Sequence, residues 1–174
     1  VCFLASWLPD GTVNIMTISW LTPLDNDGRF LLSMNQKRHT ASVLARQPSF
    51  TLSVAVAGSE ELLRRAGSCS GSRVDKVQQL GVPLCRAGWR GAWSAGEAAA
   101  AAAEAAWPPD GSMDLPTAGE AAAAASSPAV ACGVAHVVAR VRHVRGAHGH
   151  FVLTCETRHA YVRRTYWSGK TLKP

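Results

Sequence analysis

The chain has 174 residues and a formal net charge of +6, a length that favours one domain. It contains neither an uncharged apolar run of about 18 residues nor a basic segment before an apolar core, so it predicts no membrane-spanning helix and no secretory signal. The five cysteines are scattered, without Cys-x-x-Cys pairs or zinc-finger spacing. They indicate reduced thiols, no metal site, and a soluble protein of the cytoplasm or an organelle stroma that is not secreted.

Apolar runs alternate with turn signals at the start of the chain. Val1–Ser6 is compatible with a strand, Pro9–Gly11 is a turn signal, and Val13–Leu21 alternates well enough for a second strand. These two runs predict a hairpin around Asp10 and Gly11. After a further turn, Arg29–Met34 predicts a third strand.

Three short helices are predicted, and each has a polar capping residue at its start and Pro or Gly at its end. The helices and their boundary residues are Ala41–Gln47 between Thr40 and Pro48, the segment after Ser59 that ends at Gly67, and the segment that starts at Ser72 or Asp75 and ends at Gly81. A fourth strand, Phe50–Val56, lies between the first two helices.

Residues 86–128 differ in composition from the rest of the chain. This segment is rich in alanine and contains five acidic but only two basic residues. We interpret it as a low-complexity insertion within one domain of residues 1–174, disordered or loosely helical. The remaining 16 basic and 7 acidic residues give a net charge of +9, which favours an anionic ligand such as a phosphate, a nucleotide or nucleic acid. A basic surface without a ligand is the alternative.

Two further strands follow the insertion, Val134–Val141 and Phe151–Thr157. The connections among the six predicted strands are too short for a parallel sheet. The fold class is therefore mainly β, a small antiparallel barrel with short peripheral helices.

Phosphate-binding side chains are concentrated between the third strand and the first helix, in the stretch SMNQKRHTAS at residues 33–42. Lys37 and Arg38 offer charge-assisted hydrogen bonds, Thr40 offers a hydroxyl, and the following amides belong to a helix start. This combination favours a phosphate site. An exposed basic turn with Thr40 as a simple cap would have the same sequence.

Four segments together resemble one family. They are DGTVNIMTISWLTPL, LLSMNQKRHTASVL, CSGSRVDKVQQLGV and the C-terminal stretch from VAHVVARV to YWSGK. In order and spacing they are similar to the flavin reductase-like proteins with the FMN-binding split-barrel fold, over about residues 1–84 and 130–174. The resemblance implies a six-stranded antiparallel split β-barrel with the alanine-rich segment inserted into it.

The resemblance also implies three groups of cofactor-binding residues. One is the phosphate loop, one is the strand beside the flavin ring, and one is a Ser-Gly-x-x-x-Asp-Lys segment. The residues are Asn35, Lys37, Arg38 and Thr40 in the phosphate loop; Asn14, Met16, Thr17 and Ser19 in the strand; and Ser70, Gly71 and Lys76 in the Ser-Gly-x-x-x-Asp-Lys segment. Trp20 lies in the same predicted strand, and we assign it to the core of the protein and not to stacking on the flavin ring.

The family often has a Gly-Asp-His turn near the nicotinamide, and this chain has Gly146-Ala147-His148 there. His148 is therefore the candidate catalytic residue, with His150 as a nearby substitute, but the missing carboxylate puts efficient use of a pyridine nucleotide in doubt. His136 is interpreted as a residue of a strand face.

The implied activity is electron transfer from NADH or NADPH through bound FMN, or FAD, to a second flavin or another acceptor, in a homodimer. A non-catalytic FMN-binding electron carrier is the main alternative. A basic barrel that binds nucleic acid is less favoured, because only RHAYVRRTYW interleaves aromatic and basic residues.

Overall fold

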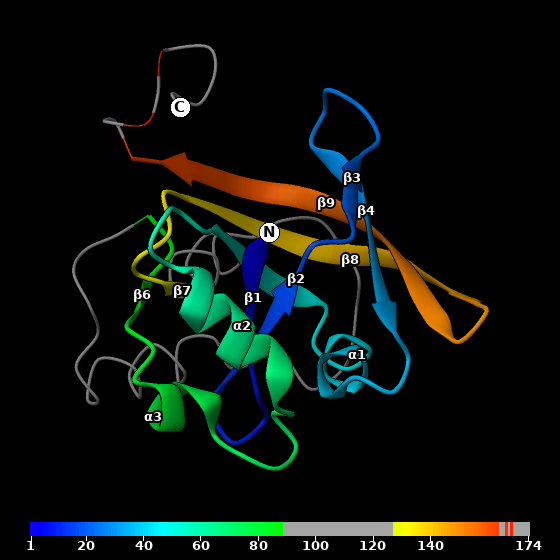
Figure 1. Ribbon diagram of the computed structural model, residues 1–174. Coiled ribbons are helices and arrows are strands. Elements are labelled where there is room, and N and C mark those ends of the chain that lie inside the picture. The colour runs from blue at the N-terminus through cyan, green and yellow to red at the C-terminus, as the bar shows by residue number, and fades with distance from the viewer. Residues whose placement is uncertain (89–126, 164–165, 167, 169–174) are drawn as a thin grey trace.

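The computed structural model describes residues 1–88, 127–163, 166 and 168. In chain order, the elements are β1 (Cys2–Trp7), β2 (Val13–Ile18), β3 (Leu21–Pro23), β4 (Arg29–Asn35), α1 (His39–Leu44), β5 (Ser49–Val54), α2 (Glu60–Ser68), α3 (Lys76–Leu80), β6 (Leu84–Arg86), β7 (Pro128–Val130), β8 (Ala135–Ala147) and β9 (His150–Val162). Figure 1 shows α2 in front of β1 and β2, with α1 and α3 lower on either side.

Seven strands form one antiparallel sheet in the order β2-β1-β5-β8-β9-β4-β3. β2 and β3 are its two edges, although only Ser19 and Trp20 separate them along the chain. Because so short a link spans about 10 Å at most, the sheet has to curl until its edges approach each other. This confirms the antiparallel split barrel that the sequence predicts.

The number of strands differs from the prediction of six. The segment Val13–Leu21 is interrupted at Ser19 and Trp20, so its last residue belongs to β3. β6 and β7 pair with each other in a separate two-stranded sheet. Each of β3, β6 and β7 has three residues, too few for an alternating pattern to be recognised.

The sheet is covered on both faces near β1, which explains its continuous apolar run. Leu4 belongs to the cluster inside the curled sheet, with Phe50. Phe3 points the opposite way, into a second cluster with Ala66 of α2. Successive strand residues point to opposite faces, so two buried faces require apolar residues at consecutive positions.

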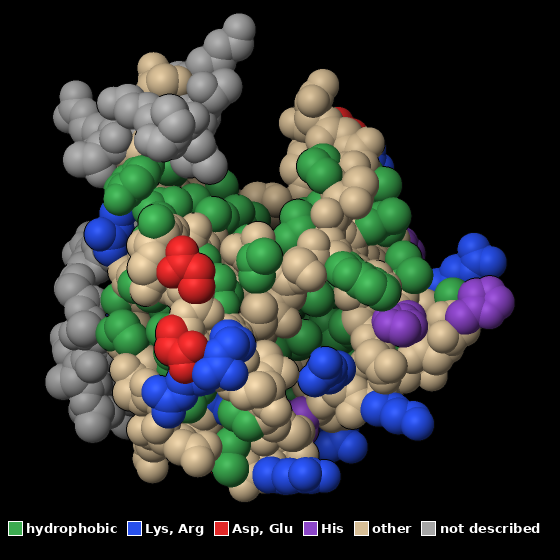
Figure 2. Space-filling view, viewed as in Figure 1, with side chains coloured by type: hydrophobic (Ala, Val, Ile, Leu, Met, Phe, Trp, Pro, Cys, Tyr) green, Lys and Arg blue, Asp and Glu red, His purple; other side chains and the backbone are tan. Residues whose placement is uncertain are grey.

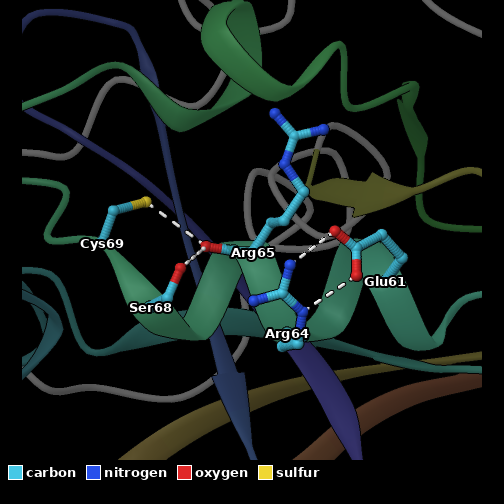
Figure 3. Close-up of polar contacts among 5 residues, drawn as sticks. All are labelled: Glu61, Arg64, Arg65, Ser68 and Cys69. Atoms are coloured by element: carbon cyan, nitrogen blue, oxygen red, sulfur yellow. Dashed lines mark hydrogen bonds and ion pairs between the residues drawn. The ribbon is translucent and has the colours of Figure 1, made fainter.

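Helix α2 extends one residue beyond Gly67, where the sequence predicts its end. The hydroxyl of Ser68 and the thiol of Cys69 both donate to the carbonyl oxygen of Arg65, at 2.9 and 3.4 Å (Figure 3). These side chains satisfy a carbonyl group of the last turn. Arg64 and Glu61 form an ion pair with two hydrogen bonds on the outer face, and solvent screens this exposed pair.

Helix α3 begins after Asp75, the later of the two predicted starts, and ends at the predicted Gly81. Asp75 is its N-cap, and its carboxylate accepts from the amides of Val77 and Gln78 at 2.9 and 3.1 Å. Gly81 ends the helix with a φ of 61°, a left-handed conformation that glycine adopts without strain.

The last two strands are longer than predicted, and each spans 13 residues. His148 and Gly149 form the two-residue turn between them, with positive φ angles of 46° and 78°. Two positive φ angles match a type I′ turn, which follows the twist of an antiparallel pair. His148 is thus a turn residue at the end of a long projecting hairpin, visible at the right of Figure 1.

The two ends of the alanine-rich segment are held by ordered contacts. β6 includes Arg86 and β7 begins at Pro128, so both limits of the predicted insertion lie in strands. Residues 89–126, where the rest of that prediction falls, lie outside the described residues. The buried His136 joins the two ends, because its Nδ1 accepts from the amide of Gly88 at 3.3 Å and its Nε2 lies 3.1 Å from the carbonyl oxygen of Val130.

Protonation of His136 is expected to destabilise the fold. Burial lowers the pKa of this imidazole to about 4, although the Val130 carbonyl opposes the shift. An unfolded histidine has a pKa near 6.5. Above about pH 6.5 neither the folded nor the unfolded protein binds a proton at this imidazole. As the pH falls from about 6.5 toward about 4, only the unfolded protein binds it, so the unfolding free energy decreases by about 3 kcal/mol across that window.

The measurement is urea denaturation between pH 7 and pH 4. Wild type should lose about 3 kcal/mol more unfolding free energy across this range than His136→Gln, which cannot titrate. Parallel pH profiles for the two proteins would show that the buried imidazole does not have this role.

All five cysteines are described and carry free thiols, as the sequence predicts. Burial raises the pKa of Cys85 to about 11 and that of Cys155 to about 12, so both remain protonated near neutral pH. None of the three described helices has the length and apolar character that crossing a membrane requires.

Candidate functional site

Segments that lie far apart in the sequence meet at Asn14 on β2. Its side-chain amide donates to the hydroxyl of Thr40 on α1 at 3.0 Å, and a longer contact of 3.5 Å reaches the hydroxyl of Ser6. Asn14 and Thr40 are both buried. The strand and the basic loop that the sequence singled out are therefore in direct contact.

Gly71 brings the third segment to the same point. A Cβ atom at this position would lie 2.8 Å from Oδ1 of Asn14 and 3.2 Å from the ring of His39. Real Cβ atoms do not approach so closely, so a side chain at this position would displace Asn14 or the segment itself, whereas glycine fits. Next to it, the hydroxyls of Ser70 and Ser72 lie 2.9 Å apart.

The basic loop is a tight turn organised by Asn35. The side-chain oxygen of Asn35 accepts from the amide of Lys37 at 2.9 Å, and its carbonyl oxygen accepts from the amide of Arg38 at 3.0 Å. These bonds present the side chains of Lys37 and Arg38 to solvent. Figure 2 shows Lys and Arg side chains gathered along the lower part of the molecule.

The sequence prediction that Thr40 caps the helix is wrong. Arg38 is the N-cap and α1 begins at His39, so Thr40 lies inside the first turn, with its hydroxyl directed to Asn14. The amide of Ala41, which was expected to be available for a phosphate, donates to the carbonyl oxygen of Arg38 at 3.0 Å. This amide is therefore already engaged within the turn.

Lys76 is buried, and its ammonium group donates to the carbonyl oxygen of Ala66 at 2.6 Å. It thus ties α3 to α2. Burial lowers the pKa of Lys76, and the positive charge of Arg38 lowers it further, while Cys69 opposes both. The main cause of the lowered pKa is thus the burial of Lys76 between the two helices.

The residues of β2 divide between its two faces. The hydroxyl of Thr17 donates to the carbonyl oxygen of Leu63 at 2.6 Å, so it faces α2. Asn14 and the half-buried Met16 lie on the opposite face, and the exposed Ser19 follows the end of the strand. Among the described strands β2 pairs only with β1, so the main chain along its other edge forms no strand pair there.

Trp20 is not in the core, contrary to the sequence interpretation. It lies in the two-residue link between β2 and β3, is 61% exposed, and stacks on the ring of His150 at a centroid distance of 5.3 Å. Gln36 joins this pair to the basic loop, because its side chain donates to the carbonyl oxygen of His150 at 3.1 Å. The sequence analysis missed Gln36. It also missed the stacking of Trp20 on His150, because these two residues lie far apart in the sequence.

His148 is exposed, two residues from His150, at the hairpin turn. No described contact joins it to Asn14, Thr40 or Gly71. Tyr166 is described, but most of the predicted Tyr-Trp-x-Gly-Lys tail lies outside the described residues.

A pocket of about 310 Å³ is lined by Asn14 and Gly71 and by none of the residues of the basic loop. Its walls come from the turn between β1 and β2, from the first half of β2 and from residues 71–76. The sequence analysis did not identify the turn residues Leu8, Asp10 and Thr12 as part of a site.

The comparisons with known proteins agree with this arrangement. The family model described as "Flavin reductase like domain" matches residues 1–106. The chain belongs to the flavin reductase-like family. The match includes the strand, the loop and the Ser-Gly segment that meet at Asn14. No curated protein sequence matches significantly.

Solved structures show the same fold as this flavin reductase-like chain. An FMN-binding protein from Thermus thermophilus has a TM-score of 0.69 and 19% identity, covering 99% of this chain and 76% of that one. A flavoredoxin from Methanosarcina acetivorans has a TM-score of 0.69 and 15% identity, with coverages of 99% and 73%. An NADH:FAD oxidoreductase from Streptomyces globisporus has a TM-score of 0.63 and 15% identity, with coverages of 94% and 75%.

Proposed function

We propose that the chain binds FMN and transfers electrons from NADH or NADPH through it to a second flavin or another acceptor. The observation that carries this proposal is the contact of Asn14 with both Thr40 and Gly71. It unites the three segments that the family resemblance assigns to the cofactor. Low-identity structures support only the fold, so the ligand and the donor are part of the proposal.

The residues present fit a flavin phosphate. Lys37 and Arg38 are exposed cations on one turn. A dianionic phosphate would relieve the repulsion between these cations and accept charge-assisted hydrogen bonds from the loop. Gly71 supports the same reading, because any side chain there would fill the space beside Asn14.

The free edge of β2 is the proposed support for the flavin ring. Asn14 and Met16 share one face there, and Ser19 follows where the sheet is split. The short side chains of Asn14 and Ser19, and an edge without a partner among the described strands, let a flat ring approach the main chain. Thr17, in contrast, contributes indirectly, because its hydroxyl holds α2.

The chemistry of electron transfer would belong to the flavin, which accepts and releases hydride or electrons. The protein residues bind it, orient it and control access. We propose that His148 and His150 face the donor or acceptor side, with His150 positioned by its stacking on Trp20. A homodimer would cover the exposed Trp20, Leu24 and Val144, and the molar mass from light scattering tests this.

A flavin-binding electron carrier is the second candidate. It is favoured by Ala147, which stands where the family often has a carboxylate beside the histidine. Such a protein would bind FMN equally well but would oxidise a nicotinamide nucleotide slowly.

An anaerobic spectrum separates the two functions. The protein is loaded with FMN, freed of excess flavin, and titrated with NADH or NADPH while the flavin absorbance is recorded. Bleaching within seconds supports the reductase, and retained flavin that bleaches only with dithionite supports the carrier. A protein that retains no flavin would contradict both functions.

A further inference from the structure

Gln36 holds the turn between β8 and β9 against the basic loop through two hydrogen bonds. Its backbone amide donates to the carbonyl oxygen of Gly149 at 3.0 Å, and its side-chain Nε2 donates to the carbonyl oxygen of His150 at 3.1 Å. Gln36 follows Asn35, which pairs with His150 at the end of β4. The side chain of Gln36 therefore adds a bond just beyond the last residue pair of β4 and β9.

Gly146 on β8 leaves room for the side chain of Gln36. A Cβ atom at Gly146 would lie only 3.2 Å from Nε2 of Gln36. The Gln36 side chain thus reaches from the end of β4 across β9 to β8. Because Nε2 is the far end of a flexible side chain, alanine at position 146 would displace this group and not the backbone.

The contacts of Gln36 determine where the histidines of the hairpin lie. The ring of His150 stacks on Trp20, and His148 lies two residues earlier, in the turn. His150 is therefore held at two points, by its ring on Trp20 and by its carbonyl oxygen on Gln36. Since Gln36 directly precedes the two cations of the basic loop, it links the position of the histidines to that of the loop.

We propose that Gln36 is a positioning residue for electron transfer, which fixes His148 and His150 relative to a flavin whose phosphate lies on the basic loop. This inference rests on the proposed flavin-binding function. Gln36 acts through the turn and requires no contact with the reacting atoms. Rates of transfer depend steeply on such placement, so the loss of one contact at the turn should be measurable.

Two substitutions remove this side-chain contact without altering the cations of the loop. Gln36→Met keeps the length of the side chain but cannot donate to the His150 carbonyl, while the backbone bond to Gly149 remains. Gly146→Ala pushes Nε2 aside. The side chain of Gln36 is exposed, so both variants should fold. Gln79→Met is the control, because it makes the same exchange at an exposed residue of α3.

NMR spectra of the flavin-free protein measure the position of His150. The ring of Trp20 shields the imidazole protons of His150, and comparison with His150→Gln assigns their signals. In Gln36→Met and in Gly146→Ala these signals should shift toward those of an unshielded imidazole. Gln79→Met should leave them at their wild-type positions.

Anaerobic stopped-flow mixing of the FMN-loaded protein with NADH or NADPH measures the effect on electron transfer. Gln36→Met and Gly146→Ala should each lower the limiting rate of flavin bleaching about two- to tenfold, the range expected for one hydrogen bond, while FMN affinity stays at the wild-type level. Because both substitutions break the same contact, the double variant should be no slower than the slower single variant. Gln79→Met should bleach at the wild-type rate.

The outcomes separate this inference from the proposed function. Unchanged bleaching rates in variants that still bind FMN overturn the inference and leave the proposed function intact. Additive losses in the double variant also overturn it, because the two residues then act separately. Failure of the wild type to bind flavin contradicts the proposed function instead, and the imidazole signals then show independently whether Gln36 positions His150.

Discussion

Replacing Arg38 by alanine is expected to weaken FMN binding by about 10- to 100-fold, because a charge-assisted hydrogen bond contributes roughly 1.5–3 kcal/mol. Riboflavin has no phosphate, so its affinity should change little. The side chain of Arg38 is exposed, and its backbone bonds to Asn35 and Ala41 do not depend on the guanidinium group. The variant should therefore fold normally.

Fluorescence titration of FMN and riboflavin measures both affinities. Arg46→Ala is the matched control, since it removes an exposed arginine just after the same helix but outside the loop. It should bind FMN as wild type does. Equal weakening of FMN and riboflavin by Arg38→Ala would contradict the assignment of the phosphate to this loop.

Gly71→Ala is the second substitution with a large expected effect. The new Cβ would lie 2.8 Å from Oδ1 of Asn14, so either the buried Asn14 side chain or the Ser-Gly segment has to move. We expect a loss of about 1–3 kcal/mol in unfolding free energy, as in other overpacked sites, together with weaker flavin binding. Urea denaturation and FMN titration measure the two effects.

Two further variants show whether the contact with Asn14 is responsible. Gly67→Ala is the control, because its Cβ would meet Thr17 at an ordinary 3.5 Å, and alanine should match or improve stability in α2. In an Asn14→Ala background, Gly71→Ala should cost about 1 kcal/mol less than in wild type. A cost that is the same in both backgrounds would show that the strain lies elsewhere.

The sequence predicted those parts of the fold that depend on local patterns. Asp75 and Gly81 bound α3 as expected, because capping and left-handed glycine act within a few residues. The long strands β8 and β9 were located, although their ends were not, because exposed polar residues at the end of a hairpin interrupt the apolar alternation. Strands of three residues carry no such pattern.

Other features depended on contacts between distant segments and could not be predicted. Thr40 has the properties of a helix cap, but a bond from Asn14, 26 residues earlier, gives its hydroxyl another partner. Trp20 resembles a core residue in its strand, yet the closure of the sheet places it outside, against His150. The clustering of Lys37 and Arg38 on one exposed turn could be predicted, because the two cations are adjacent in the sequence.

The central claim is that β2, the basic loop and the Ser-Gly segment bind one flavin together. Amide NMR spectra of the ¹⁵N-labelled protein, recorded during FMN titration, test it most directly. The account predicts saturable shifts for residues 14–19, 35–40 and 70–76, with the middle segment much less affected by riboflavin. Saturable binding that shifts other surfaces and leaves these three segments unchanged would contradict it.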